Sequence, residues 1–406
     1  MFKNKYVNLK FNFIFSYIMG ALFIGRHIET AIIEAAQYFS VITITGPRQS
    51  GKTTLIKHLF PHLLYVSLEN IQLVEFASND PIAFLHQNPE GMILDEVQHV
   101  PQLLSYIQGI VDADKKKRFI LSGSSQFSML QSITQSLAGR TAIFELLPLS
   151  YAEIKPIVSK KTLNELLFEG FYPAIHAQEN KAELLYPAYT RTYLERDVRD
   201  LLQVKNMMQF QIFLKLCAAR IGSLCNASEL ANEVGVSSHT IQSWLSILQQ
   251  SYVITLLQPF YENTRKRLTK TPKLYFNDTG IACYLLGIES PQQLERDKMR
   301  GHVFENFIVI EALKKRYNEG KDSNIYFYRD SNHNEVDLLI KKNNLFTVIE
   351  IKSSQTYSSS FEKGIKNFEA NFPDKVHKKK LIYCGDMENE NSAIQILNYS
   401  NSKIFE

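Results

Sequence analysis

The residues with the clearest chemistry form a short loop that follows a β-branched run, Ile42 to Thr45. Its two glycines and the residues after them have the spacing G-x-x-x-x-G-K-T. Glycine permits positive φ and lets backbone N–H groups approach phosphate oxygens, lysine reaches the β- and γ-phosphates, and the threonine hydroxyl binds Mg²⁺. The loop therefore predicts a nucleotide site, and its residues are Gly46, Pro47, Arg48, Gln49, Ser50, Gly51, Lys52, Thr53 and Thr54.

A second apolar run, Gly91 to Leu94, ends in the acidic pair Asp95 and Glu96. Such a pair also occurs at ordinary solvated strand ends. Behind a phosphate-binding loop, however, Asp95 is predicted to hold the magnesium shell and Glu96 to polarise the water that attacks the γ-phosphate. No N-K-x-D sequence that would read guanine follows the pair, so ATP is the expected nucleotide.

Two further features bear on phosphate chemistry. The apolar run Phe119 to Leu121 ends in hydroxyl groups, and both Ser122 and Ser124 are candidates to approach the γ-phosphate. Arg140 follows Gly139 after an expected helix. It is a candidate arginine finger, in its own or a neighbouring subunit, and equally a cation that caps the C-terminus of that helix.

The last third of the chain holds a second constellation, made of Glu305, Asp337, Glu350 and Lys352. Side chains alternate along a strand, so Glu350 and Lys352 share a face, and a hairpin brings Asp337 beside them. Carboxylates of this kind bind a hard cation, and the lysine acts on water and phosphate. An acid followed by acid-x-lysine is the pattern of PD-(D/E)XK nucleases, although valine precedes Asp337 where that pattern has proline. An active metal site, a binding-only relic and a solvated hairpin all remain open.

Between the two constellations, residues 226–250 have helix-turn-helix spacing, with Gly235 at the turn and apolar residues at helical period after it. Ser228 and Ser237 or Ser238 are the expected caps. A basic run follows, and with the strand 252–257 it predicts a β-wing that contacts a phosphate backbone. A solvated hairpin or a docking surface for the ATPase domain would have the same composition. The candidate nucleic-acid contacts are Arg265, Lys266, Arg267, Lys270 and Lys273.

The chain resembles the prokaryotic AAA-family ATPases that have G-P-R-Q-x-G-K-T-T in the phosphate-binding loop and an uncharacterised C-terminal domain. The resemblance covers nearly everything from Arg26 onward and implies ATP binding in a nucleic-acid setting, without a substrate. The stretches that carry it are Gly46 to Leu55, Leu94 to Gln98, Ser122 to Ser125, Leu137 to Arg140, Pro148 to Ser150 with Glu153, and Tyr193 to Val198.

Length and composition limit the remaining possibilities. A chain of 406 residues is too long for one core, and a net charge of +4 is too small to identify a polyanion partner. The four cysteines lack metal-ligand spacing and are expected to be reduced core thiols. Lysines precede the apolar run Phe11 to Gly25, which imitates a signal peptide but is shorter than the roughly twenty residues of a membrane span. An upstream start-codon artefact or a short extra helix is favoured.

The expected fold class is α/β, with a P-loop NTPase (AAA-like) domain, a helical extension, a winged helix-turn-helix and a C-terminal α/β nuclease-like domain. The predicted boundaries are 1–25 for an N-terminal extension, 26–150 for the ATPase core, 151–205 for the helical extension, 206–275 for the winged helix and 276–406 for the nuclease-like domain.

The predicted function is an ATP- and Mg²⁺-dependent ATPase that acts on DNA, with metal-dependent nuclease activity in the C-terminal domain. The alternative is a nucleotide-dependent switch whose C-terminal domains bind DNA or protein partners without cleavage. A cytoplasmic location without stable membrane association is expected, and self-association into a homo-oligomer is allowed by the sequence.

Overall fold

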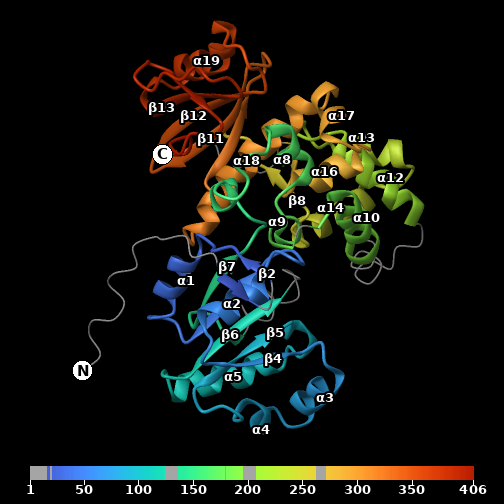
Figure 1. Ribbon diagram of the computed structural model, residues 1–406, viewed down its shortest axis with the longest axis vertical. Coiled ribbons are helices and arrows are strands. Elements are labelled where there is room, and N and C mark those ends of the chain that lie inside the picture. The colour runs from blue at the N-terminus through green and yellow to red at the C-terminus, as the bar shows by residue number, and fades with distance from the viewer. Residues whose placement is uncertain (1–15, 19–20, 124–135, 179, 195–206, 262–270) are drawn as a thin grey trace.

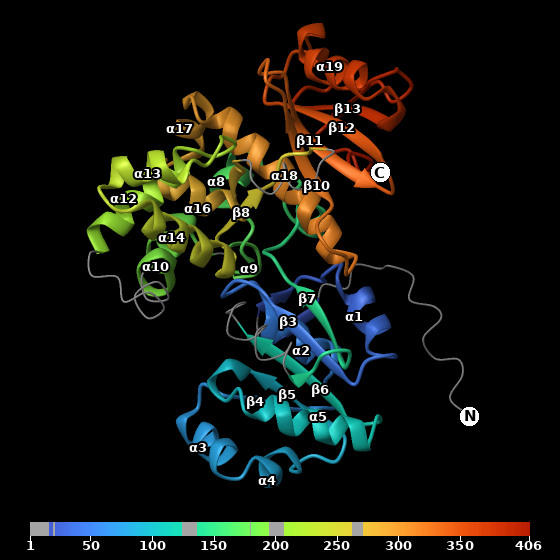
Figure 2. The ribbon, with the colours of Figure 1, turned by 180° about the vertical axis from the view of Figure 1, so that it is seen from behind.

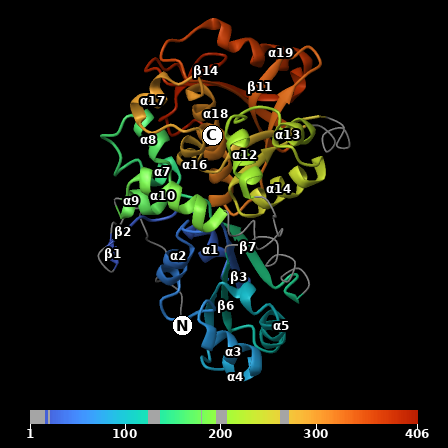
Figure 3. The same cartoon turned by 90° about the vertical axis from the view of Figure 1, so that its right-hand side faces the viewer.

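The computed structural model describes residues 16–18, 21–123, 136–178, 180–194, 207–261 and 271–406. A parallel sheet with flanking helices forms one end of the molecule and a mixed sheet forms the other (Figure 1). Viewed from the side, a helical middle part lies between them (Figure 3). A short antiparallel pair, β1 (Ser16–Ile18) and β2 (Ala21–Phe23), precedes the first sheet. Strands therefore stand where a short helix was expected, and residues 1–15 lie outside the described part.

The first sheet is five-stranded and parallel, in the order β4-β5-β6-β3-β7. Strands β3 and β5 are buried along their whole length because helices cover both faces. The carboxyl ends of its strands meet at one edge, and this edge carries the loop after Thr45. The strands are β3 (Val41–Thr45), β4 (Leu64–Ser67), β5 (Gly91–Asp95), β6 (Arg118–Gly123) and β7 (Thr141–Glu145).

Alternation along β3 divides the packing of this sheet into two layers. Ile42 and Ile44 belong to one buried cluster, together with residues of α1 and α2. Val41 belongs to the other cluster, which includes residues of α3, α4 and α5. This two-residue period is the expected consequence of strand geometry. The helices are α1 (Glu29–Ala35), α2 (Lys52–Leu59), α3 (Ile71–Asn79), α4 (Pro81–Leu85) and α5 (Leu103–Ala113), and η1 (Val97–His99) follows β5.

The middle part is helical and contains the expected turn between two helices. Asn226 caps α13 by accepting hydrogen bonds from the backbone N–H groups of Ser228 and Glu229, so Ser228 is not the cap. Gly235 is left-handed and Ser237 caps α14, as expected. The elements are α7 (Tyr151–Ile154), α8 (Leu163–Glu169), α9 (Pro173–Ala177), α10 (Ala182–Tyr189), η2 (Thr190–Leu194), α12 (Met207–Ala218), α13 (Ala227–Val234) and α14 (Ser238–Gln250).

An antiparallel strand pair follows α14, with Ile254 opposite Phe276. The basic run expected at the tip of this pair, with Arg265, Lys266, Arg267 and Lys270, lies outside the described residues. The elements are β8 (Ile254–Leu257), β9 (Lys273–Phe276), α16 (Thr279–Leu285) and α17 (Pro291–Arg296).

The C-terminal sheet has the order β10-β11-β12-β13-β14. Its first three strands form an antiparallel meander, and β13 and β14 are parallel to β12. The elements are α18 (Arg300–Asn318), β10 (Ile325–Arg329), β11 (Glu335–Lys342), β12 (Leu345–Lys352), η3 (Ser359–Glu362), α19 (Lys363–Asn371), η4 (Pro373–Lys375), β13 (Val376–Tyr383) and β14 (Gln395–Asn398).

Helix α18 links the two ends of the molecule (Figure 2). Its residues share one buried cluster with the middle part and the C-terminal sheet. Beyond its end, a Cβ at Gly320 would lie 3.0 Å from the ring of Phe144 in β7. The cysteines are free, as expected, and Cys384 is only partly buried. Among the described residues, no helix is long and apolar enough to cross a membrane.

Helix α16 packs against α10 so closely that Gly280 has no room for a side chain, because a Cβ there would lie 2.3 Å from the Tyr186 ring. We expect Gly280→Ala to destabilise the protein by about 1–3 kcal/mol through overpacking. Gly109→Ala is the control, since Gly109 is exposed on α5 and its added Cβ would meet nothing within 4 Å, and this change should stabilise the protein by about 0.5–1 kcal/mol. Urea unfolding measures both. Equal unfolding midpoints for the two variants would contradict the close packing of Gly280 against Tyr186.

Candidate functional site

The loop between β3 and α2 has the backbone that a phosphate-binding loop needs. Gly46 has φ +150° and a Cβ there would lie 2.2 Å from the carbonyl oxygen of Leu146. Gly51 has φ +93° and caps α2, which begins at Lys52. The positive φ values disfavour larger residues at both positions, and Gly46 also has no room for a side chain. The two ends of the motif are therefore fixed where N–H groups at a helix N-terminus can face a phosphate.

Lys52 lies within this loop. Its Nζ donates to the carbonyl oxygens of Gly46, at 2.9 Å, and Pro47, at 2.8 Å. Burial lowers the pKa of the ammonium to about 8, although the nearby carboxylates of Glu96 and Asp95 favour its charged form. The cation is thus held at the loop by weak carbonyl acceptors, which a phosphate would replace with stronger ones.

Asp95 ends β5 and gathers hydroxyl groups from three neighbouring segments. Its Oδ2 accepts from Thr53 Oγ1 at 2.7 Å and from Tyr65 OH at 2.8 Å, and its Oδ1 accepts from Ser122 Oγ. Strand register explains this, since Asp95 is opposite Ser122 in β6 and Ser67 in β4. The structure thus brings the predicted magnesium residues Thr53 and Asp95 together. Ser124 lies outside the described residues.

Glu96 follows directly in a left-handed conformation, with φ +55°. A carboxylate oxygen of Glu96 accepts a hydrogen bond from Gln98 Nε2. Of the carboxylates near Lys52, Glu96 has the larger electrostatic effect on it. The left-handed backbone turns the chain out of β5 and places this carboxylate at the cavity instead of continuing the strand.

These residues line a cavity of about 490 Å³. Its other wall comes from the middle part of the chain, and the side chain of Pro173 lies 3.7 Å from the Cβ position of Gly51. This wall belongs to the helical extension predicted for residues 151–205, whereas Tyr65 stands in no motif and was not predicted. The lining residues are Arg48, Gln49, Gly51, Lys52, Thr53, Thr54, Tyr65, Glu69, Asp95, Glu96, Pro173, Ala174, Gln178, Asn180 and Leu185.

Arg140 does not reach this cavity within its own chain. It immediately precedes β7, and Thr141 pairs with Val41 at the opposite edge of the sheet from the loop after Thr45. Its guanidinium instead binds Asp112 of α5, with Nε to Oδ1 at 2.7 Å and Nη2 to Oδ2 at 2.9 Å. A finger acting within the subunit is therefore wrong, and the expectation of a finger in a neighbouring subunit stays a prediction.

In the C-terminal sheet, the structure brings Asp337, Glu350 and Lys352 together. Lys352 Nζ lies 3.2 Å from Asp337 Oδ2 and 3.1 Å from Glu350 Oε2. Burial and the charge of Asp337 raise the pKa of Glu350 to about 10. Burial alone would raise the pKa of Asp337, but the charge of Lys352 brings it down to about 2. The proximity of the two acids thus drives their pKa values apart, and the Lys352 ammonium contacts both.

Glu305 is engaged differently from the expected metal ligand. It accepts hydrogen bonds from Tyr275 OH at 2.7 Å and Lys273 Nζ at 3.0 Å. Lys273 also lies 2.5 Å from Glu335. Among the described residues, no three or more His, Cys, Asp or Glu side chains form a group that could hold a metal ion.

The same contacts correct the expectation for Lys273. Its side chain is only 3% exposed, in a network with two glutamates, so it is not available to a phosphate backbone. The sequence pattern missed this because both acids are distant along the chain.

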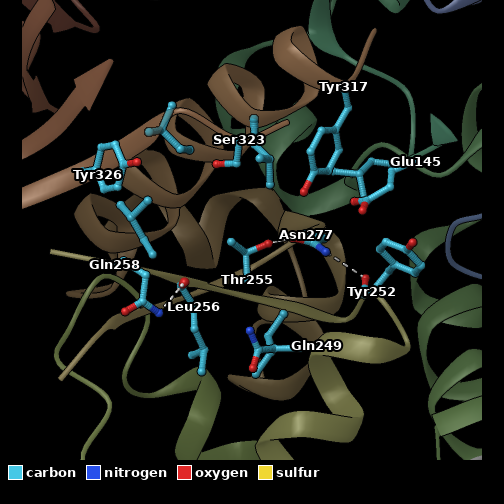
Figure 4. Close-up of a pocket in the computed structure, with 15 residues that line it drawn as sticks. Glu145, Gln249, Tyr252, Thr255, Leu256, Gln258, Asn277, Tyr317, Ser323 and Tyr326 are labelled. Carbon is cyan, nitrogen blue, oxygen red and sulfur yellow. Dashed lines mark hydrogen bonds between the residues drawn. The ribbon is translucent and has the colours of Figure 1, made fainter. Parts of the chain in front are cut away.

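A further cavity of about 430 Å³ lies where β7, β8 and α18 meet (Figure 4). Asn277 links Thr255 and Tyr252 there, accepting from Thr255 Oγ1 at 2.6 Å and donating to the Tyr252 carbonyl oxygen at 3.0 Å. The hydroxyl of Tyr252 lies 2.6 Å from that of Thr45, the residue before Gly46. This junction therefore joins the middle part to the strand that carries the phosphate-binding loop.

Three protein-family models match the chain. Residues 38–155 match a model described as AAA domain. Residues 160–292 and 300–401 match two models described as domains of unknown function, DUF8612 and DUF4143. Together with the parallel sheet and the loop geometry, the first match identifies a P-loop ATPase domain. The predicted boundaries of the other domains stay predictions.

Similar proteins include uncharacterized ones from Mycobacterium. Those of Mycobacterium tuberculosis and Mycobacterium bovis are each 29% identical over 325 residues, which is 79% of this chain and 72% of theirs. An uncharacterized protein of Methanocaldococcus jannaschii is 23% identical over 397 residues, covering 89% of this chain and 85% of its own.

Two solved structures from Pyrococcus are similar at 14% identity. A Walker-type ATPase of Pyrococcus abyssi has a TM-score of 0.46, and the match covers 65% of this chain and 96% of that one. A Signal Transduction ATPase with Numerous Domains from Pyrococcus horikoshii, which has a tetratricopeptide repeat sensor, has a TM-score of 0.26 with coverage of 73% and 47%.

Lys273→Gln should destabilise the protein, because it leaves Glu305 and Glu335 without their shared ammonium. Removing one partner of a buried ion pair costs about 3–5 kcal/mol. Lys403→Gln is the control, since it removes the same charge from a solvated pair with Glu390 and should change the unfolding midpoint little. Urea unfolding compares the two variants. If Lys273→Gln were as stable as the control, the network would not be structural.

Proposed function

We propose that the chain binds ATP at the loop between β3 and α2 and hydrolyses it with Mg²⁺. The observation that carries this proposal is the contact of Thr53 with Asp95 beside Lys52, inside one cavity. The donor set fits a magnesium ion, because hydroxyl and carboxylate oxygens are hard ligands and two protein ligands suffice when phosphates and water complete the shell.

Each residue then has one task. Lys52 stabilises the charge of the β- and γ-phosphates, while Thr53 and Asp95 hold the metal. Bound Mg²⁺ would neutralise negative charge that develops on the phosphates. Glu96 accepts a proton from, and orients, the attacking water, and Gln98 restrains the Glu96 carboxylate. Pro173 and its neighbours in the middle part exclude water from one side of the cavity.

Lys52→Ala should weaken ATP binding by roughly 10- to 100-fold, because a charged hydrogen-bond partner of the phosphates is lost. Glu96→Gln should bind ATP normally but hydrolyse it at least roughly 100-fold more slowly, since the amide cannot accept the proton from water. Titration calorimetry and phosphate release measure the two effects. Two separate changes at exposed residues are matched controls. Lys116→Ala controls for Lys52→Ala, and Glu75→Gln controls for Glu96→Gln. Wild-type turnover by Glu96→Gln would remove the general-base role.

We further propose that the C-terminal part acts on DNA, either as a metal-dependent nuclease or as a binding domain. Support for a nuclease is the position of Asp337 on β11 beside Glu350 and Lys352 on the adjacent antiparallel strand β12. The helix-turn-helix of α13 and α14, followed by the β8–β9 pair, supports a winged helix as the contact region. The basic run Arg265 to Lys270 would supply the phosphate contacts.

The alternative is a nucleotide-dependent switch that binds DNA or a protein partner without cleaving it. It is favoured by the cations that the chain itself supplies, since Lys352 bridges Asp337 and Glu350 while Lys273 binds Glu305. A metal ion would have to displace these ammonium groups. The alternative uses the same fold and differs only in whether this displacement occurs.

DNA cleavage with Mg²⁺ or Mn²⁺, with and without ATP, distinguishes the two. A nuclease should cleave, and Asp337→Asn and Lys352→Ala should each lose roughly 100-fold or more of the rate, while exposed Asp374→Asn should not. A switch should leave DNA intact yet retard it in gels, with an affinity that falls steeply with salt and changes with ATP. If the protein neither cleaves DNA nor binds it in a salt-dependent way, DNA is excluded as its target and a protein partner remains.

A further inference from the structure

Arg26 lies before the segment that matches the AAA domain and outside the phosphate-binding motif, yet it contacts the loop directly. It is only 7% exposed. Its Nη1 donates to the carbonyl oxygen of Ser50 at 2.9 Å and its Nη2 to that of Leu147 at 2.8 Å. Its Nε faces Glu153 at 3.2 Å. The guanidinium therefore joins the loop, the turn after β7 and helix α7 at one point.

The contact with Ser50 acts on the peptide between Ser50 and Gly51. In a trans peptide, the carbonyl and the following N–H point in opposite directions. Arg26 holds the Ser50 carbonyl, so the N–H of Gly51 points away from Arg26. Gly51 lines the candidate nucleotide cavity and has no side chain to fix this peptide plane. A guanidinium is suited to the task because its donors are rigidly arranged.

Glu153 offsets the desolvation cost of burying Arg26, which would be large for a lone guanidinium. Its Oε1 also accepts from the His27 N–H at 2.7 Å, and its Oε2 from the Ser150 N–H at 2.7 Å. Burial alone would raise the pKa of Glu153, but the charge of Arg26 and these N–H groups keep it below its ordinary value. Both carboxylate oxygens of Glu153 are therefore hydrogen-bonded, and the pair is fixed to two backbone segments.

We propose that Arg26 is a positioning residue of the nucleotide site, which orients the Ser50–Gly51 peptide so that the Gly51 N–H faces the phosphates. Glu153 in turn orients the guanidinium. This inference rests on the proposed ATPase function and extends it to a residue that touches neither phosphate nor metal. Without Arg26 the Ser50 carbonyl loses the side-chain donor that holds this peptide plane, and more of the loop must order itself when nucleotide binds.

The test compares Arg26→Gln, Arg26→Lys and Glu153→Gln with the wild type in the full chain. Arg26→Gln should raise KM for ATP roughly tenfold or more with a much smaller change in kcat, because the Gly51 contact is lost from ground and transition states alike. Arg26→Lys should be intermediate, since one ammonium can bond the Ser50 carbonyl but cannot also keep the geometry toward Leu147 and Glu153. The double variant Arg26→Gln/Glu153→Gln should be no worse than Arg26→Gln alone.

Thermal unfolding without nucleotide separates this role from a merely structural one. A structural role would lower Tm and leave KM of the folded fraction unchanged, and that result in either Arg26 variant overturns the proposal. If Arg26→Gln fails to fold, Arg26→Lys supplies the same comparison. Arg316→Gln, which removes an arginine from the end of α18, should keep wild-type KM. If the wild type does not bind ATP in calorimetry, the proposed function itself is overturned. If the wild type binds ATP and the Arg26 variants keep the wild-type KM, only this inference is overturned.

Discussion

The turn from Leu147 to Glu153 depends on buried charged groups that approach it from two sides. On one side, Arg26 binds the Leu147 carbonyl and Glu153. On the other, α18 supplies Glu311, which accepts from the Tyr151 N–H at 2.8 Å, and Lys314, which donates to the Leu149 carbonyl at 2.8 Å. Glu311 and Lys314 also pair with each other at 2.9 Å. Each charge is buried and hydrogen-bonded, so losing one leaves an uncompensated partner. The ATPase domain and the rest of the chain are thereby held in one arrangement.

Positive side chains have different tasks at the two candidate sites. Lys52 sits against carbonyl oxygens, which carry only partial charge, and therefore remains suited to a phosphate. Lys352 and Lys273 sit against acidic side chains, so these lysines compete with an incoming metal ion for the acids, and the acids compete with an incoming phosphate for the lysines. The first site is preorganised for nucleotide. The second is neutralised by its own lysines, so its chemistry requires that these pairs be rearranged.

Local patterns allowed the first site to be predicted, and distant contacts explain what was missed. The loop from Gly46 to Thr54 is one continuous segment, and Asp95 ends a strand whose register brings it to the same edge of the sheet. Arg26 and Pro173 enter only through the tertiary fold, and neither stands in a motif. The pairing of Lys273 with Glu305 and Glu335 is likewise invisible in a basic run, where charge alone suggested a surface. Strand order, with β3 between β6 and β7, was not derivable from apolar runs that look alike.

Helix α18 connects the turn after β7 with the second site. Glu305 lies in its first half, Glu311 and Lys314 lie further along, and Tyr317 near its end lines the cavity at β7. From Glu305 to Tyr317 an α-helix rises about 18 Å. If nucleotide shifts the turn at Leu147 to Glu153, either α18 must follow or the buried bonds to Glu311 and Lys314 must break. If α18 followed, Glu305 would be displaced relative to β11 and β12. Any energetic coupling that results must be reciprocal, so a ligand that rearranges the second site would also change the affinity of the first for nucleotide.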